Sequence, residues 1–482
     1  MAKQPMLKFV QIGRQMPVKR GSEDRKTDFN EIYTEFAAEK AKEQASRCSQ
    51  CGVPYCQAHC PLHNNIPDWL MLTATGRLEE AYRTSQATNT FPEICGRICP
   101  QDRLCEGSCT TEQSGHGAIT IGAVEKYITD TAWEKGWIKP ITPPRERAQS
   151  VGIIGAGPGG LAAAEQLRRK GYKVTVYDRY DRVGGLLVYG IPGFKLEKDV
   201  VQRRADYLEA SGVEFVLNCN VGEDISFQDL RAKHNSVLIA TGVYKAKSLN
   251  APGAGAEGVY PALEYLTTSN KQNLGDAVPD YDSGKLNAKG KKVVVIGGGD
   301  TAMDCVRTAI RQGASSVTCL YRRNRENMPG SQREVANAEE EGVTFEWLAA
   351  PRAVIDNGGK ASAVRAVRMR LGLPDASGRQ APEEVPGSDF DIEADMVIQA
   401  LGFDPEDLPI LFNENQLTVN RWGAVRVDYS TMMTSMDGVF AVGDIVRGAS
   451  LVVWAVKEGR DAAESIHEYL LACATDRPVA AE

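Results

Sequence analysis

The chain has 482 residues, enough for two to four domains, with 42% apolar and 25% charged residues as in ordinary globular proteins. The formal net charge of −7 argues against a nucleic-acid-binding surface. No apolar run approaches the roughly 18–20 residues that span a bilayer, and the start of the chain lacks an apolar signal core. These features predict a cytoplasmic protein that binds neither nucleic acid nor membrane.

Eight of the twelve cysteines lie between residues 48 and 109, among segments with helical patterns. A reducing compartment disfavours disulfides, so this dense patch indicates metal or redox chemistry. The first group runs Cys48-x2-Cys51-x4-Cys56-x3-Cys60-Pro61, and the second runs Cys95-x3-Cys99-Pro100-x4-Cys105-x3-Cys109.

Two kinds of metal site fit eight cysteines. Two groups of four thiolates could close two tetrahedral zinc sites. Structural zinc usually takes paired Cys-x2-Cys knuckles, however, and the second group has none. Runs with short spacings and a proline after a cysteine are typical of iron–sulfur clusters, which also carry electrons as zinc cannot. We therefore expect clusters, with zinc as the alternative.

A proline-rich segment over residues 139–150 follows the cysteine region. The composition changes sharply after it, which predicts a linker and a domain boundary near residue 145. Few contacts usually cross such a boundary, so the two sides are expected to be separable.

Two similar units follow the linker. The first is an apolar strand from Val151, a glycine turn, a helix, and a second strand that ends at Asp178. The second repeats this order from Lys292 to Arg322. Each is a βαβ half of a dinucleotide-binding fold. The polar segment 268–291 between them predicts a boundary near residue 280.

The first turn has the GxGxxG spacing at Gly155, Gly157 and Gly160. These glycines permit a tight turn, the approach of a pyrophosphate to the backbone, and close packing of the helix on the strand. Asp178, after the second strand, is placed to accept hydrogen bonds from an adenosine ribose.

The second unit ends in arginines where the first ends in Asp178. Guanidinium groups at Arg322 and Arg323 would bind a 2′-phosphate, which favours NADPH over NADH. The alternative is that Arg322, Arg323 and Arg325 form only a solvated face.

This part of the chain resembles the two-dinucleotide flavoproteins that include glutathione reductase and thioredoxin reductase. Further matching motifs are Ile239-Ala-Thr-Gly242 and Ala441-Val-Gly-Asp444. The resemblance implies that the first turn binds FAD, that the second binds the nicotinamide nucleotide, and that Asp444 contacts the ribityl chain of the flavin. The implied FAD residues are Gly155, Ala156, Gly157, Gly159, Gly160, Asp178, Gly185, Thr241, Gly242, Gly443 and Asp444. The implied NADPH residues are Gly297, Gly299, Asp300, Thr301, Ala302, Arg322 and Arg323.

One feature of the disulfide-reducing members is absent. They carry a cysteine pair beside the flavin, whereas residues 181–187 here contain no cysteine. A disulfide reductase is therefore disfavoured, and electrons leaving the flavin need another acceptor. The cysteine region supplies one.

The whole chain then resembles a more specific family. The first cysteine motif, Cys95-Gly-Arg-Ile-Cys-Pro100 and Ala118-Ile-Thr-Ile-Gly-Ala-Val-Glu125, set before a flavoprotein of this type, are similar to the small subunits of bacterial NADPH-dependent glutamate synthases. Dihydropyrimidine dehydrogenase and NADPH–ferredoxin oxidoreductases contain the same module.

This resemblance implies two [4Fe–4S] clusters whose ligands come from both cysteine groups. One would be held by Cys48, Cys51, Cys56 and Cys109, and the other by Cys60, Cys99 and Cys105. Dihydropyrimidine dehydrogenase has a glutamine as the fourth ligand of the second cluster, at the place of Glu125 here. Cys95 is the competing candidate for that position.

The resemblance also implies the function. NADPH would reduce FAD, with no general acid or base in this chain, and the clusters would lead electrons to a large subunit. That subunit, with glutaminase and FMN sites, would make L-glutamate from L-glutamine and 2-oxoglutarate. After loss of Met1 this chain would begin at Ala2 rather than at the catalytic cysteine of that glutaminase. The alternatives are an NADPH–ferredoxin oxidoreductase with a different partner and a zinc-containing adaptor.

The predicted fold class is α/β, with two Rossmann-like domains of the glutathione and thioredoxin reductase type preceded by a helical iron–sulfur domain. The expected boundaries are 1–145 for the cluster domain, 146–280 and 429–482 for the FAD domain, and 281–428 for the NADPH domain.

Overall fold

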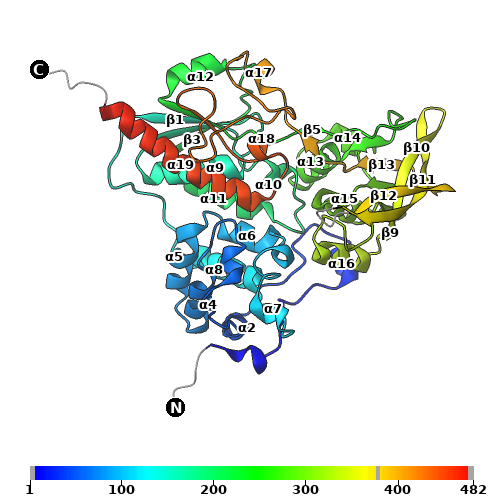
Figure 1. The fold of residues 1–482 in the computed structure, drawn as a ribbon, viewed down its shortest axis with the longest axis horizontal. Helices are drawn as coiled ribbons and strands as arrows, with labels where there is room; N and C mark the ends of the chain where they lie inside the picture. Colours follow the sequence, from blue (N-terminus) through cyan, green and yellow to red (C-terminus); the bar gives the residue numbers. More distant parts are fainter. Residues whose placement is uncertain (1–5, 376–379, 476–482) are drawn as a thin grey trace, which may run out of the picture.

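The computed structural model describes residues 6–375 and 380–475. It consists of a helical N-terminal domain and two α/β domains, each built on a parallel five-stranded sheet (Figure 1). The fold class predicted from the two glycine turns is confirmed. Within the described ranges, no helix has the length and apolar character needed to cross a membrane.

The N-terminal domain packs short helices around a small apolar core. Trp69 and Leu70 of α4 meet Val124 and Ile128 of α8, and all four side chains are at most 1% exposed. A proline in the first turn starts both α4 and α6, where its missing N–H costs nothing. The α-helices are α1 (Ser22–Arg25), α2 (Ala38–Ala45), α3 (Tyr55–Ala58), α4 (Ile66–Ala74), α5 (Leu78–Thr88), α6 (Pro92–Ile98), α7 (Thr110–Gln113) and α8 (Ile121–Glu134). Two 3₁₀ helices are η1 (Lys8–Val10) and η2 (Gln101–Arg103).

The first α/β domain is a parallel sheet in the order β15-β4-β1-β2-β3. Its central strands read as unbroken apolar runs because helices cover both faces. The strands are β1 (Ser150–Ile154), β2 (Lys173–Tyr177), β3 (Val213–Val216), β4 (Ser236–Ile239) and β15 (Val439–Ala441). The helices are α9 (Pro158–Arg169), α10 (Leu186–Tyr189), α11 (Lys198–Ala210), α12 (Phe227–Lys233), α17 (Leu408–Leu411), α18 (Asp444–Arg447) and α19 (Val452–Thr475).

The second α/β domain repeats this plan in the order β6-β13-β7-β8-β9. An antiparallel sheet, β10-β11-β12, projects from it at the right of Figure 1. The strands are β6 (Val259–Pro261), β7 (Lys292–Ile296), β8 (Ser316–Tyr321), β9 (Thr344–Trp347), β10 (Ala349–Asn357), β11 (Lys360–Pro374), β12 (Gln380–Glu393) and β13 (Met396–Gln399). The helices are α13 (Ala262–Asn273), α14 (Pro279–Asp282), α15 (Asp300–Arg311) and α16 (Gln332–Glu340). The chain crosses between the domains on the paired strands β5 (Lys245–Ala246) and β14 (Phe403–Asp404).

Two of the expected domain boundaries fall inside folded units. β6 pairs with β13, and Tyr265 and Leu266 of α13 lie in the core of the second sheet, so that domain starts well before residue 281. Leu408 and Phe412 pack with Ile154 in the core of the first sheet, so the chain returns there well before residue 429. The outer strand β6 and the short helix α17 carry no glycine turn, which is why the sequence pattern did not reveal them.

The few contacts expected across the proline-rich segment are not what the structure shows. Phe91 and Ile94 of the helical domain share a core with Val188 and Leu208 of the first α/β domain. At this interface Arg204 of α11 donates to the carboxylate of Glu93 of α6 at 2.6 Å, and both side chains are at most 1% exposed. A single linker therefore joins two domains that are packed as one body.

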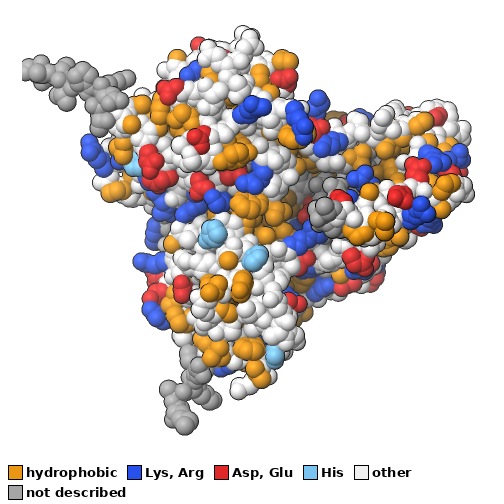
Figure 2. Space-filling model, in the orientation of Figure 1, with side chains coloured by type: hydrophobic (Ala, Val, Ile, Leu, Met, Phe, Trp, Pro, Cys, Tyr) orange, Lys and Arg blue, Asp and Glu red, His pale blue; other side chains and the backbone are white. Residues whose placement is uncertain are grey.

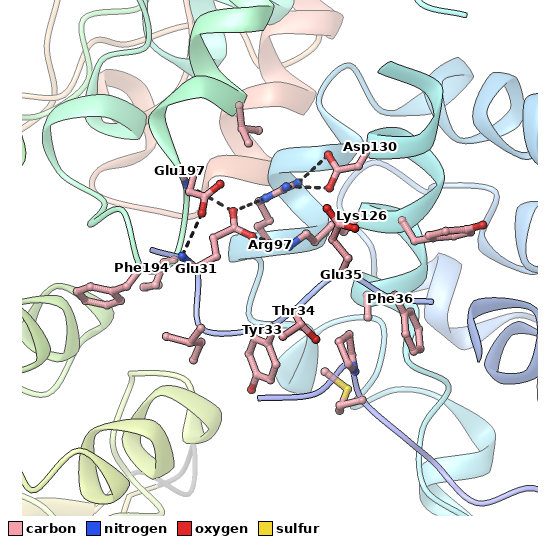
Figure 3. Close-up of a pocket in the computed structure, with 18 of the residues that line it drawn as sticks. Glu31, Tyr33, Thr34, Glu35, Phe36, Arg97, Lys126, Asp130, Phe194 and Glu197 are labelled. Atoms are coloured by element: carbon pink, nitrogen blue, oxygen red, sulfur yellow. Dashed lines mark hydrogen bonds and ion pairs between the residues drawn. The ribbon is translucent and has the colours of Figure 1, made fainter. Parts of the chain in front are cut away.

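The N-terminal arm, residues 14–36, lies where all three domains meet. Lys19 donates to Asn337 of α16 at 3.0 Å, and Arg25 donates to Glu340 at 2.8 Å. Beside the arm is a cavity of about 340 Å³, where Arg97 points between Glu31 of the arm and Asp130 of α8 (Figure 3). These contacts hold the second α/β domain against the other two.

Candidate functional site

The first glycine turn joins β1 to α9 and tolerates no side chain at two positions. Gly155 has a φ of +110°, and a Cβ there would lie 2.3 Å from the carbonyl oxygen of Ala240. A Cβ on Gly160 would lie 2.0 Å from the carbonyl oxygen of Gly155. Gly157 instead faces open space, as a site for a pyrophosphate requires.

Asp178 lies at the end of β2, next to this turn. Its carboxylate accepts hydrogen bonds from the N–H groups of Ala156 at 2.6 Å and Tyr180 at 2.8 Å. Burial raises the pKa of Asp178. The side chain therefore links the turn to β2 at the place where a ribose is expected.

A cleft of about 250 Å³ runs from this turn between the two α/β domains. Gly443 and Asp444, after β15, form part of its wall, and burial raises the pKa of Asp444 to about 7. The hydroxyl of Thr241 is buried there without a hydrogen-bond partner in the described chain, so the wall has a polar atom ready for a ligand. Of the predicted FAD residues, the cleft is lined by Gly155, Gly157, Gly159, Asp178, Thr241, Gly242, Gly443 and Asp444.

The remaining predicted FAD residues support the turn without lining the cleft. Ala156 and Gly160 are buried within the turn and the first part of α9. A Cβ on Gly185 would lie 3.0 Å from the Cα of Gly157, so this glycine lets a neighbouring loop approach the turn.

The second turn joins β7 to α15 and has the same construction. A Cβ on Gly297 would lie 2.3 Å from the carbonyl oxygen of Ala400, whereas Gly299 faces open space. Asp300 and Thr301 line the same cleft as the first turn, and Ala302 is buried behind them. Two nucleotide-type turns therefore open into one cleft, from opposite domains.

The three arginines after β8 are not equivalent. Arg325 pairs with Glu339 of α16 at 2.8 Å. Arg322 and Arg323 form no ion pair with any described residue, and Arg322 is exposed. Two guanidinium groups beside the second turn are therefore unpaired.

The sequence analysis missed several residues of the cleft. Lys195 reaches across it and donates to Asp304 of α15 at 2.9 Å, which joins the two α/β domains. No local pattern marks Lys195. Asp304 is one helical turn after Asp300 on α15, and this spacing was a usable signal.

Four cysteines of the helical domain surround a small cavity. They are Cys48, Cys51, Cys56 and Cys109, the set expected to hold one cluster. Thr110 lies 3.1 Å from the sulfur of Cys51, and Gln50 donates to the sulfur of Cys48 at 3.3 Å. Burial raises the pKa of the Cys48 thiol to about 11 and that of Cys56 to about 12, so these thiols need a metal to lose their protons at neutral pH.

The second group gathers around Glu125 of α8. A hydrogen bond to Cys95 and burial raise the pKa of Cys99. Burial is also the main cause that raises the pKa values of Cys60 and Cys105, and the charge of Glu125 nearby raises both further. One oxygen of Glu125, Oε1, accepts from Asn64 at 2.7 Å and Asn89 at 3.1 Å. Burial raises the pKa of Glu125 to about 8. Both candidates for the fourth ligand are thus beside the other three.

The donor set of these groups fits iron–sulfur clusters. Buried thiols with hydrogen bonds to sulfur are typical of such sites.

The cysteine region reaches the nucleotide cleft. Ile98, Cys99 and Pro100, at the end of α6, line the cleft together with Gly157 and Gly443. Cys99 thus belongs to the second cysteine group and also to the cleft wall. Here a predicted cluster ligand meets predicted flavin residues.

Comparison with protein families agrees with this division. Residues 25–137 match the family described as dihydropyrimidine dehydrogenase domain II, 4Fe-4S cluster. Residues 149–459 match the pyridine nucleotide-disulphide oxidoreductase family. Together the matches assign to the chain an iron–sulfur cluster, a flavin and a nicotinamide nucleotide.

Three relatives extend over almost the whole chain. The glutamate synthase [NADPH] small chain of Azospirillum brasilense is 66% identical over 480 residues, covering 100% of this chain and 99% of the relative. The protein of the same name from Escherichia coli K12 is 47% identical, covering 97% and 99%. The putative oxidoreductase AegA of Escherichia coli K12 is 48% identical over 94% of this chain but only 69% of its own length.

A solved structure shares the fold. FprA from Mycobacterium tuberculosis in complex with NADPH has a TM-score of 0.58 and 18% identity, covering 68% of this chain and 86% of that protein. The family follows from the sequence relatives: the chain belongs to the glutamate synthase [NADPH] small chains, which are NADPH-dependent oxidoreductases.

Proposed function

We propose that the chain takes hydride from NADPH at an FAD and feeds single electrons through two [4Fe–4S] clusters to a large glutamate synthase subunit. The observation that carries this proposal is the position of Cys99. It lines the cleft onto which both nucleotide turns open, and it belongs to a cysteine group. A cluster held by Cys99 would therefore be the one next to a flavin bound in the cleft.

Different residues of the cleft are proposed to bind FAD and NADPH. Gly155, Gly157 and Gly160 would admit the FAD pyrophosphate, Asp178 its ribose, and Thr241 and Asp444 its ribityl chain and ring. Gly297, Gly299, Asp300, Thr301 and Ala302 would hold the NADPH pyrophosphate, with Arg322 and Arg323 at the 2′-phosphate. When bound, FAD accepts a hydride and releases single electrons, so this chain needs only to align the two nucleotides and exclude water.

The cysteines divide into an inner and an outer set. Cys60, Cys99 and Cys105, with Glu125 or Cys95, would hold the cluster near the cleft. Cys48, Cys51, Cys56 and Cys109 would hold the other, away from it. The charge of Cys56 contributes to the raised pKa of Cys105, so the two sets lie close to each other. The sets therefore support a path that leads from the cleft towards the surface.

The large subunit is proposed to cover the outer set. Residues 48–67 contain no Asp, Glu, Lys or Arg, in a chain with 25% charged residues. Val53 is 65% exposed and Tyr55 49% exposed on the loop between Cys51 and Cys56. Uncharged side chains also occupy much of the middle of the helical domain in Figure 2. A surface that lacks charged side chains and exposes aromatic and aliphatic ones is typical of the core of a protein interface.

A second candidate function rests on the similarity to AegA. The chain covers 69% of that protein, so closely related sequence occurs in a longer protein with a different name. In that case the same electron output would serve another acceptor, as in an NADPH–ferredoxin oxidoreductase.

Anaerobic purification tests the cofactors, and reconstitution tests the partner. The chain should contain FAD and about eight irons, as two [4Fe–4S] clusters require. It should bind a glutamate synthase large subunit and support NADPH-dependent glutamate formation. Stoichiometric zinc with negligible iron would refute the clusters. Intact cofactors with dye reduction but no binding to the large subunit would favour the second candidate.

A further inference from the structure

The segment between two predicted cluster ligands grips the second α/β domain. This segment, η2, lies between Cys99 and Cys105. Arg103 donates to three successive backbone carbonyls, those of Met328 at 2.6 Å, Pro329, and Gly330 at 2.8 Å. Asp102 accepts from the hydroxyl of Ser331 at 3.1 Å and from the N–H of Gln332 at 3.3 Å. One side of the loop 328–332 is therefore held by the helical domain.

The other side of the same loop holds the second nucleotide turn. The N–H of Gly330 donates to the carbonyl of Gly298 at 2.8 Å. The N–H of Ser331 donates to the carboxylate of Asp300 at 3.0 Å. Gly298 and Asp300 flank Gly299, which faces open space for the nucleotide. The first contact joins two backbone groups and the second reaches the side chain of Asp300, so movement of the loop would disturb the turn on both sides of Gly299.

The η2 segment is itself firmly seated. Gln101 is 1% exposed, and its amide donates to the carbonyls of Cys95 and Gly96, both at 3.1 Å. A Cβ on Gly107 would lie 1.9 Å from the carbonyl of Asp102, so the chain closes tightly behind the segment. Asp102 and Arg103 thus project from a rigid base.

We propose that Asp102 and Arg103 position the nicotinamide-nucleotide turn, so that the iron–sulfur domain completes the NADPH site. They act through the loop 328–332 and are positioning residues, without a contact of their own to the nucleotide. This inference rests on the proposed binding of NADPH at Gly297–Ala302. It explains why the loop beside the turn is gripped from a different domain.

The decisive variant is Arg103→Ala in the full chain with its cofactors, compared with wild type. The dissociation constant for NADP⁺, read from the change in flavin absorbance, should rise about tenfold, because three hydrogen bonds to the loop are lost. The KM for NADPH with a dye acceptor should rise by the same factor, with kcat within about twofold. The KM for NADH should rise equally, since the turn binds the pyrophosphate that both nucleotides share.

Controls separate positioning from general damage. Arg77→Ala removes an exposed arginine of the same domain whose one ion pair among the described residues is with Glu80, and it should leave every constant unchanged. Arg103→Lys should recover part of the affinity, because an ammonium group can still donate to a carbonyl. If Arg103→Ala does not fold, Asp102→Asn should give a smaller shift in the same direction.

Three results would overturn the inference. One is unchanged nucleotide affinity in Arg103→Ala with full FAD and iron. Another is a rise for NADPH alone, which would place Arg103 at the 2′-phosphate. The third is a fall in iron content in step with the loss of affinity. A wild-type chain that NADPH does not reduce would instead refute the proposed function.

Discussion

Among the described residues, Arg322 and Arg323 differ from their neighbour Arg325 in having no acidic partner. Arg325 is held by Glu339, whereas the other two form no ion pair with any described residue. An unpaired guanidinium group gains more from a phosphate than one that must first leave a carboxylate. This contrast favours the proposed 2′-phosphate site over the alternative of a solvated face.

Replacing Arg322 and Arg323 by alanine should therefore weaken NADPH selectively. Loss of a charge-assisted contact costs about 1.5–3 kcal/mol, which corresponds to roughly a 10- to 150-fold rise in the KM for NADPH. The KM for NADH should change little. Arg325→Ala is the matched control and should keep the wild-type preference for NADPH over NADH. Equal effects on the two nucleotides would contradict the assignment.

Glu125 is buried, and the hydrogen bonds that described residues donate to its carboxylate all reach one of the two oxygens. Amide groups fix its Oε1, and its Oε2 has no hydrogen-bond partner within the described residues. Cys95, by contrast, already lies beside the side chain of Asn89 at 3.7 Å. We therefore propose Glu125, rather than Cys95, as the fourth ligand of the second cluster.

Substitution of Glu125 and of Cys95 in turn should identify the fourth ligand of the second cluster. Glu125→Ala should reduce iron from about eight towards about four per chain, while Cys95→Ser should keep about eight. Iron analysis of anaerobic samples, with electron paramagnetic resonance of the reduced protein, measures this. The reverse pattern would identify Cys95 as the ligand.

At the scale of elements, the start of α18 forms part of the cleft wall proposed to hold FAD. β15 delivers Asp444 to the cleft, and burial and Glu458 raise the pKa of Asp444 to about 7. A carboxylate is a stronger acceptor than a neutral acid, so the proposed ribityl contact should depend on the protonation state of Asp444.

Asp444→Ala should weaken FAD binding by about 1.5–3 kcal/mol, the usual contribution of a hydrogen bond to a charged group. In wild type, FAD affinity should fall as the pH drops through about 7, because protonation removes the charge of the acceptor. Asp444→Asn should bind FAD with intermediate affinity and without this pH dependence. Retention of FAD after gel filtration at several pH values measures both effects. A pH dependence that persists in Asp444→Asn would assign it to another group.

The loop between Cys51 and Cys56 is the element proposed to meet the large subunit. Tyr55→Glu places a charge in the middle of this uncharged surface and should lower partner-dependent glutamate formation at least about tenfold. NADPH-dependent dye reduction should remain at the wild-type level. Trp422→Glu is the control, because the Trp422 side chain is also exposed, at 65%, but lies outside the helical domain. Equal glutamate formation by Tyr55→Glu and wild type would place the interface elsewhere.

At the scale of the whole molecule, buried charge joins the helical domain to the first α/β domain. Arg204 of the first α/β domain is 1% exposed and pairs with Glu93 of the helical domain, with Glu165 3.6 Å away. Removing one member of such a pair leaves an uncompensated charge, at a cost of about 3–5 kcal/mol.

A truncation that begins near Gln149 should therefore fail as a stable flavoprotein. It would leave Arg204 without Glu93 and expose the apolar surface that Phe91 and Ile94 cover. Glu93→Gln in the full chain should be destabilised in the same direction but should still bind FAD. Thermal unfolding and size-exclusion chromatography compare the two. A soluble, monomeric truncation with full FAD would show that the shared core is dispensable.

The sequence alone determined the chemistry of this protein. Glycine turns, the cysteine groups and the arginines after the second unit have their meaning at spacings of a few residues, because each depends on local backbone geometry or on residue type. They were enough to predict the fold class, the cofactor classes and the family.

Only the tertiary structure decided how these parts meet. Cys99 reaches the cleft wall that Gly157 and Gly443 also form. The contacts of Lys195 with Asp304, of Arg204 with Glu93 and of Arg103 with Met328 join residues 109, 111 and 225 positions apart. The boundaries of the second domain also depend on a three-residue strand that is recognisable only by its partner. Such contacts have no local signature, because their stabilisation arises from burial and hydrogen bonding that exist only after the distant segments have come together.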